Sequence, residues 1–85
     1  MPNPLEGYLE RYFVLDPSDT STWTSTSDIV DRLFLMGYKA PSARVLAMEV
    51  ATTLQERGHK KCKRSTGSGR VWGYLGITPS GQFVP

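Results

Sequence analysis

Apolar side chains return at helical spacing at the start of the chain. In residues 3–14 they fall at positions i, i+3, i+4, i+7 and i+8, and these positions are Leu5, Tyr8, Leu9, Tyr12 and Phe13. Such spacing places them on one face of a helix. Asn3 is a suitable N-cap residue and Pro4 suits the first helical position. The pattern therefore predicts a helix over residues 3–14, followed by a polar turn at residues 16–22.

Two further segments with helical spacing lie close together and predict a helix-turn-helix over residues 26–58. The first helix is expected over residues 26–36, between the N-cap Ser25 and a terminating glycine. The second is expected over residues 43–57, with an apolar face formed by Ala43, Leu46, Ala47, Val50, Ala51 and Leu54. A break of the second helix near Ala47 is an alternative that the sequence leaves open.

After the second helix the helical period is lost. The runs 59–66 and 70–77 consist largely of residues compatible with strands, and they flank a glycine-rich connection at residues 67–69. Two such runs around a short glycine-rich loop predict a β-hairpin over residues 59–77. Residues 78–85 are expected to form a short tail.

Aromatic residues occur at two strand-like places. Trp23 and Thr24 are β-prone and fit a short strand of their own. Trp72 and Tyr74 alternate with apolar residues along the second run of the hairpin. We expect these two rings to pack against the helices, with stacking on nucleic acid as the alternative. Trp23 is likewise expected to belong to the core.

Helix, turn, helix and hairpin is the order of elements in a winged helix-turn-helix. The sequence thus predicts a single α+β domain over residues 1–85. It would comprise about three helices and a C-terminal β-hairpin wing, with the N-terminal helix as an addition. A generic α+β arrangement of the same elements is the alternative. A chain of 85 residues is long enough for one small core and leaves little room for a catalytic pocket.

The charged residues are distributed unevenly along the chain. All eight acidic residues lie in residues 1–56 together with only four cations, whereas six cations and no acid follow from residue 57 onward. A block of one sign indicates a polyanionic partner. A solvated basic turn without a partner is the alternative, although the cations interleave with strand-type residues.

These cations and the neighbouring polar residues form the predicted DNA-binding site. On the hairpin, the candidate phosphate contacts are Lys60, Lys61, Lys63, Arg64, Ser65, Ser68 and Arg70. On the second helix, the candidates for reading base edges are Arg44, Thr52 and Gln55. The exposed face of that helix also carries two acids, Glu49 and Glu56, which would repel phosphates. The same face carries the apolar residues Val45 and Met48, which fit a protein contact.

No residue pattern predicts a catalytic site, a metal site or a cofactor. The glycine-rich connection does not precede a helix, as a phosphate-binding loop does. His59 and Cys62 are too few to hold a metal, and their odd separation along a strand places them on opposite faces. A surface histidine and a small core cysteine are expected instead. The chain is therefore not expected to be an enzyme.

Cysteine content and hydropathy bear on the location of the protein. A lone cysteine cannot form an internal disulfide, which fits a reducing compartment. The first residues lack the pattern of a signal peptide, and no apolar stretch is long enough to span a bilayer. The sequence thus predicts a cytoplasmic location and no contact with a membrane.

Three segments follow one another in a characteristic order. They are LEGYLERYF, then WTSTSDIVDRLFLMGYKAPSARVLAMEVATTLQERG, and, after the basic run, GRVWGYLGI. The middle segment ends in Leu-x-x-x-Gly (Leu54 to Gly58), and the last contains an Arg-x-Trp-x-Gly-like strand that begins at Arg70. Over residues 5–77 the chain resembles the C-terminal winged-helix domain of phage and plasmid primase–helicases of the superfamily 3 type. The resemblance implies a DNA-binding accessory or origin-binding module in the replication of a mobile element.

Two functions follow from this prediction. In the first, the hairpin cations hold the phosphates of duplex or forked DNA, and the helix at residues 43–57 lies against the groove or the backbone. In the second, Val45 and Met48, together with the neighbouring acids, dock on a helicase, a loader or another replication partner. The helicase motor and the primase site are absent from these residues, so the chain is either an excised domain or a free-standing protein of similar shape.

Overall fold

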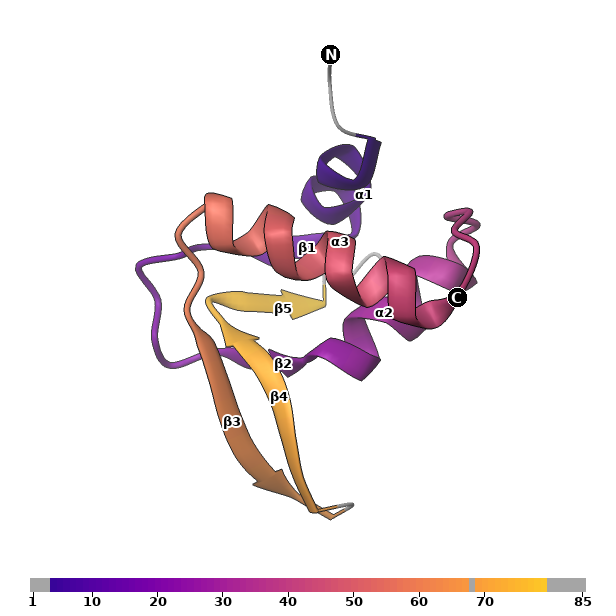
Figure 1. The fold of residues 1–85 in the computed structure, drawn as a ribbon. Coiled ribbons are helices and arrows are strands. Elements are labelled where there is room, and N and C mark those ends of the chain that lie inside the picture. Colours follow the sequence, from indigo (N-terminus) through magenta and orange to yellow (C-terminus); the bar gives the residue numbers. More distant parts are fainter. Residues whose placement is uncertain (1–3, 68, 80–85) are drawn as a thin grey trace.

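The computed structural model describes residues 4–67 and 69–79, which fold into three helices and five strands (Figure 1). In chain order these are α1 (Pro4–Tyr12), β1 (Phe13–Leu15), β2 (Trp23–Ser25), α2 (Thr26–Leu35), α3 (Ala43–Glu56), β3 (Lys61–Thr66), β4 (Gly69–Leu75) and β5 (Ile77–Pro79). The strands form two antiparallel sheets, so the predicted α+β class is confirmed. No helix in the described residues is long and apolar enough to cross a membrane.

The two central helices form where their sequence pattern predicts them. At the start of α2 the hydroxyl of Ser25 accepts a hydrogen bond from the N–H of Asp28 (3.2 Å). At the start of α3 the hydroxyl of Ser42 accepts one from the N–H of Val45 (3.2 Å). These caps satisfy N–H groups that have no partner within the helix itself. The helix α3 is continuous, so the alternative of a break near Ala47 is wrong.

The first helix is shorter than predicted. It ends at Tyr12, and the chain from Phe13 onward forms β1, which pairs with β5 so that Phe13 lies opposite Pro79. Residues 78 and 79 therefore belong to a strand and not to a tail, while residues 80–85 lie outside the described part of the chain. The Phe13 side chain is buried in the observed strand, and the predicted helix would bury it too. Burial therefore does not distinguish the two conformations, and the extended backbone is selected by pairing with β5.

The larger sheet has the strand order β2-β4-β3. The strands β3 and β4 form the predicted hairpin, although each is shorter than the predicted runs 59–66 and 70–77, and the hairpin projects away from the helices (Figure 1). The short strand expected at Trp23 and Thr24 is confirmed as β2. The hydroxyl of Thr24 donates to the carbonyl of Ile77 (2.6 Å), which links this sheet to β5.

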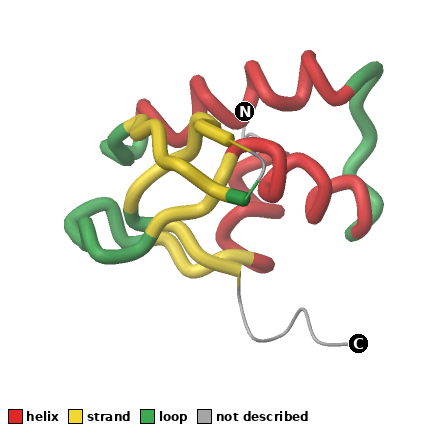
Figure 2. The backbone as a smooth tube through the Cα atoms, turned by 90° about the horizontal axis from the view of Figure 1, so that it is seen from below, coloured by secondary structure: helices red, strands yellow, loops and turns green. Residues whose placement is uncertain are grey.

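One hydrophobic core joins the helices to the strands. Its buried members are Leu5, Leu9, Phe13, Ile29, Val30, Leu33, Leu46, Val50, Leu54, Tyr74 and Ile77. Figure 2, seen from below, shows the helices gathered in one part of the molecule and the strands in the other. Because α1 supplies two of the core leucines, it is an integral part of the fold.

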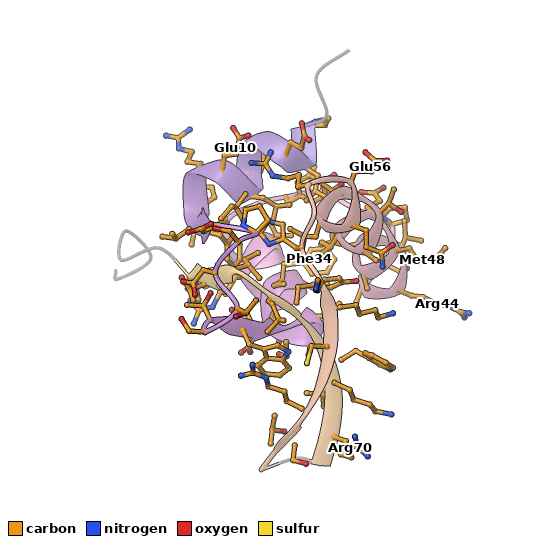
Figure 3. The ribbon with its side chains drawn as sticks, turned by 90° about the vertical axis from the view of Figure 1, so that its left-hand side faces the viewer. Glu10, Phe34, Arg44, Met48, Glu56 and Arg70 are labelled. Carbon is orange, nitrogen blue, oxygen red and sulfur yellow. The ribbon has the colours of Figure 1, made fainter. Side chains whose placement is uncertain are left out.

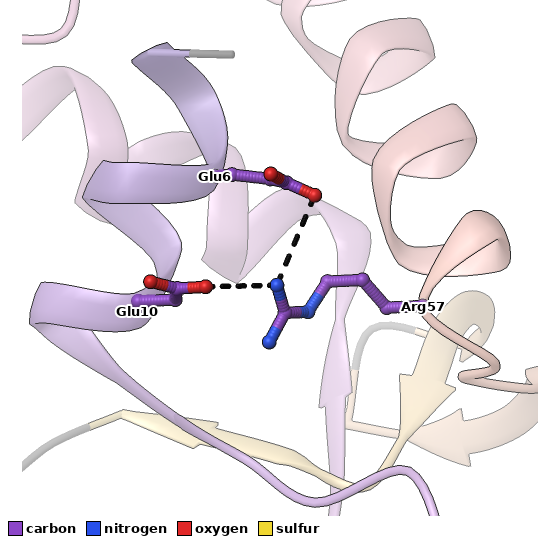
Figure 4. Close-up of polar contacts among 3 residues, drawn as sticks. All are labelled: Glu6, Glu10 and Arg57. Atoms are coloured by element: carbon purple, nitrogen blue, oxygen red, sulfur yellow. Dashed lines mark hydrogen bonds and ion pairs between the residues drawn. The ribbon is translucent and has the colours of Figure 1, made fainter. Parts of the chain in front are cut away.

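An ion pair fastens the end of α3 to α1 (Figure 4). The Nη1 atom of Arg57 lies 2.9 Å from Oε1 of Glu10 and 3.8 Å from Oε1 of Glu6. Arg57 therefore neutralises acidic residues of the N-terminal half. The excess of positive charge from residue 57 onward is thus carried by the hairpin and by Lys60, and not by Arg57.

Replacing Glu10 with glutamine is expected to lower the free energy of unfolding by about 0.2–1 kcal/mol, because the ion pair with Arg57 is partly exposed. Urea denaturation at low and at high salt measures this loss, which is expected to shrink as salt screens the pair. Asp31→Asn, which removes an exposed carboxylate from α2, is the control. A loss that is independent of salt would contradict the electrostatic account.

Candidate nucleic-acid interface

The register of the hairpin separates its cations onto two faces. In an antiparallel pair, residues directly opposite each other lie on the same side of the sheet. Lys63 pairs with Trp72 and Ser65 pairs with Arg70, whereas Arg64 pairs with Val71. Because side chains alternate along each strand, Lys61, Lys63, Ser65, Arg70 and Trp72 share one side, which we call the basic face. Arg64 lies on the opposite face.

An exposed tryptophan lies among the lysines of the basic face. The Trp72 side chain is 48% exposed, and its ring centroid is 4.9 Å from Nζ of Lys61 and 5.2 Å from Nζ of Lys63. These are cation–π distances, so both ammonium groups are held over the ring. The expectation that Trp72 packs against the helices is wrong, whereas it is confirmed for Tyr74, which is buried. The difference arises because the outer part of the hairpin extends beyond the helices (Figure 1).

A groove lies where the basic face meets α3. Its lining from α3 consists of Arg44, Ala47, Met48 and Ala51, and the hairpin contributes Lys61, Trp72 and the buried Tyr74. In Figure 3, Arg44 and Met48 project on the same side of the molecule as Arg70, which lies at the far end of the hairpin. Burial raises the pKa of Tyr74, so its phenol stays neutral and the charge of the groove is that of its cations.

The other two predicted base-reading residues of α3, Thr52 and Gln55, have different surroundings on the helix. Thr52 lines a separate cavity with Glu49, and its hydroxyl donates to the Met48 carbonyl (3.1 Å). The Tyr38 hydroxyl donates to Oε2 of Glu49 (3.0 Å); burial first, and then this carboxylate, raises the pKa of Tyr38. Thr52 is therefore not grouped with the hairpin. Gln55 is exposed and continues the line of Arg44 and Met48 along the helix.

Of the remaining predicted residues, Arg64 lies on the opposite face of the hairpin, and Lys60 and Ser65 are exposed near its two ends. The Arg64 guanidinium lies 5.6 Å from the ring centroid of Trp23, on the face opposite to the lysines. The half-buried Trp23 indole donates to the carbonyl of Cys62 (3.1 Å) and lies against Gly73. Lys60 is exposed just before β3, and its carbonyl accepts from the Leu75 N–H (2.9 Å). Ser65 is exposed near the tip, and Ser68 lies outside the described residues.

The structure corrects the expectations for both His59 and Cys62. His59 is buried and not on the surface, with its Nδ1 atom 2.9 Å from the Leu75 carbonyl. Since a carbonyl can only accept, Nδ1 carries the proton and the imidazole ties the end of α3 to β4. Cys62 is only half-buried. Within the described residues, no group of three or more histidine, cysteine, aspartate or glutamate side chains is placed to hold a metal.

Comparison of the chain with protein-family models, with curated proteins and with solved structures found no match. The resemblance to the primase–helicase domain therefore stays a prediction from the sequence. What the structure adds is the groove, in which Trp72 and the small residues Ala47 and Ala51 join the predicted cations. Ala47 and Ala51 were missed as groove residues because the sequence places both on the apolar face of their helix. Met48 was expected to be exposed, and stacking of Trp72 on nucleic acid was the alternative to packing against the helices.

Proposed function

We propose that this chain is a DNA-binding module of the winged helix-turn-helix type, in which the β3–β4 hairpin is the wing. The order of α2, α3 and the hairpin supports this assignment, as does the sheet order β2-β4-β3, with the strand before α2 joined to the hairpin. The observation that carries the proposal is the placement of Arg44 beside the basic face, which brings cations from a helix and a hairpin to one surface.

The chemistry of this surface suits phosphate groups. Arg44, Lys61, Lys63 and Arg70 are all exposed, and no acidic side chain of the described residues lines the groove. Each ammonium or guanidinium group that neutralises a phosphate releases a condensed counterion, which favours binding at low salt. Glu49, the acid closest to the centre of α3, faces the other cavity and is engaged by Tyr38. It therefore opposes DNA binding less than its position in the sequence suggested.

The sequence resemblance extends the proposal to a biological setting. In that setting the module is a non-catalytic accessory or origin-binding part of a replication primase–helicase of a mobile element, acts in the cytoplasm and has a helicase or other replication protein as a further partner. The DNA-binding proposal itself does not depend on this setting, because it rests on the charges and the groove.

Fluorescence anisotropy with a labelled duplex and a labelled single strand tests the proposal. Four phosphate contacts are expected to lower the affinity about 150-fold for a duplex, and about 50-fold for a single strand, between about 50 and about 200 mM salt. Absence of binding to both DNAs at about 50 mM salt would refute the proposal.

A protein-docking role is the second candidate function, and one observation favours it. Val45 and Met48 are exposed, and together with Tyr38 and Glu49 they line the cavity between α3 and the start of α1. An apolar floor with one carboxylate suits a protein surface better than a phosphate. Absence of DNA binding in the anisotropy assay would favour this role.

A further inference from the structure

The groove beside the basic face contains more apolar surface than phosphate binding requires. Ala47, Met48 and Ala51 form its wall on α3, and the Trp72 indole forms the wall on the hairpin. Ammonium and guanidinium groups bind phosphates without any help from these side chains. An exposed indole and an aliphatic wall between cations therefore indicate a ligand with an apolar, planar part as well as negative charges.

A nucleobase presents such a planar face only when it is unpaired and unstacked. In a duplex the faces of the bases are covered by their neighbours, and only base edges are accessible in the grooves. The residues of α3 that line the groove are poorly suited to reading edges, since only Arg44 among Arg44, Ala47, Met48 and Ala51 carries a strong hydrogen-bond donor on its side chain. Two alanines instead leave space beside the ring.

We propose that the groove binds an unpaired nucleotide, with its base against the Trp72 indole and its flanking phosphates on Lys61, Lys63 and Arg44. The preferred DNA is then a single strand or the unpaired arm of a fork. This inference rests on the proposed DNA-binding function and specifies its ligand. In the free protein the ammonium groups of both lysines lie over the indole, about 5 Å from its centroid, so a base that stacks there takes their place on the ring and they pair with its phosphates.

Two variants of Trp72 and three labelled DNAs test the inference. The DNAs are a single strand, the blunt duplex of the same sequence, and that duplex with a single-stranded arm. Wild type is expected to bind the single strand and the forked DNA more tightly than the blunt duplex. Trp72→Leu is expected to weaken binding to the first two about 5- to 150-fold, the range for losing one base–aromatic stack. Trp72→Phe keeps an aromatic face and is expected to retain most of the affinity.

Intrinsic fluorescence supplies a second readout. Stacking of a base on the exposed indole is expected to quench the emission of wild type, while Trp72→Phe, whose remaining indole is the half-buried Trp23, is expected to show little quenching. Thermal unfolding of each variant checks that the fold is retained, as expected for an exposed side chain. If Trp72→Leu lowers the affinity for blunt duplex and single strand by the same factor, the inference is wrong and the DNA-binding proposal stands. If wild type binds none of the DNAs at low salt, both are wrong.

Discussion

Replacing Lys61, Lys63 and Arg70 together with alanine is expected to lower the affinity for DNA several hundred-fold at about 0.1 M salt. Each of these cations lies on the basic face and is exposed. At this salt concentration one phosphate contact contributes roughly a factor of 5–10 through counterion release, and independent contacts multiply. The slope of log affinity against log salt is expected to become less steep by about 2–3 in the same variant.

The neighbours Lys63 and Arg64 provide a matched control for this prediction. They follow one another along β3 but lie on opposite faces, and Arg64 contacts the Trp23 ring. Anisotropy titrations of Lys63→Ala and Arg64→Ala remove the same charge from the two faces. The loss of affinity is expected to be larger for Lys63→Ala. Equal losses, in variants whose unfolding temperatures match wild type, would show that the basic face does not select where DNA binds.

Replacing Gly73 with alanine is expected to lower the free energy of unfolding by roughly 3 kcal/mol or more. A Cβ at this position would lie 2.5 Å from the Thr24 carbonyl oxygen and 2.5 Å from Cε2 of the Trp23 indole. Neither neighbour is free to move, because Thr24 pairs with β4 and the indole donates to the Cys62 carbonyl. This loss is a large part of the total free energy of unfolding of a small domain, which is about 5–15 kcal/mol.

Urea denaturation followed by circular dichroism measures the effect at Gly73. Gly7→Ala is the control, since this glycine is exposed in α1 and an added Cβ would meet nothing within 4 Å. That substitution is expected to raise the stability by about 0.5–1 kcal/mol, because alanine loses less conformational entropy than glycine on entering a helix. A Gly73→Ala variant as stable as wild type would contradict the close packing of β2 on β4.

The local pattern of the sequence was sufficient for α2 and α3 and for the existence of α1 and of the hairpin. Serine caps and terminating glycines act within a few residues, so Ser25 and Ser42 marked the starts of α2 and α3 correctly. The small sheet of β1 and β5 was missed for the opposite reason. Each of its strands has three residues, and its pairing joins positions more than sixty residues apart. Hydrophobic periodicity depends on neighbouring positions and therefore cannot indicate a contact between strands so far apart in the sequence.

The candidate site was predicted in composition but not in arrangement. A three-residue connection at residues 67–69 would pair Arg64 with Trp72, whereas the observed pairing of Thr66 with Gly69 brings Lys63 opposite that ring. Because side chains alternate along a strand, this shift of one residue decides which cations share a face with Trp72. The charges were visible in the sequence, but the face that they share was not.

The sequence by itself determined the α+β class, the starts of α2 and α3 and the concentration of positive charge on one hairpin, because capping, hydrophobic periodicity and charge are properties of neighbouring residues. Only the tertiary structure decided the rest. In the folded chain Arg57 pairs with the acids of α1, and His59 is buried against β4. Arg44 lines the same groove as the exposed Trp72. These outcomes depend on how separate elements pack together, and packing is set by the whole core and not by any one segment.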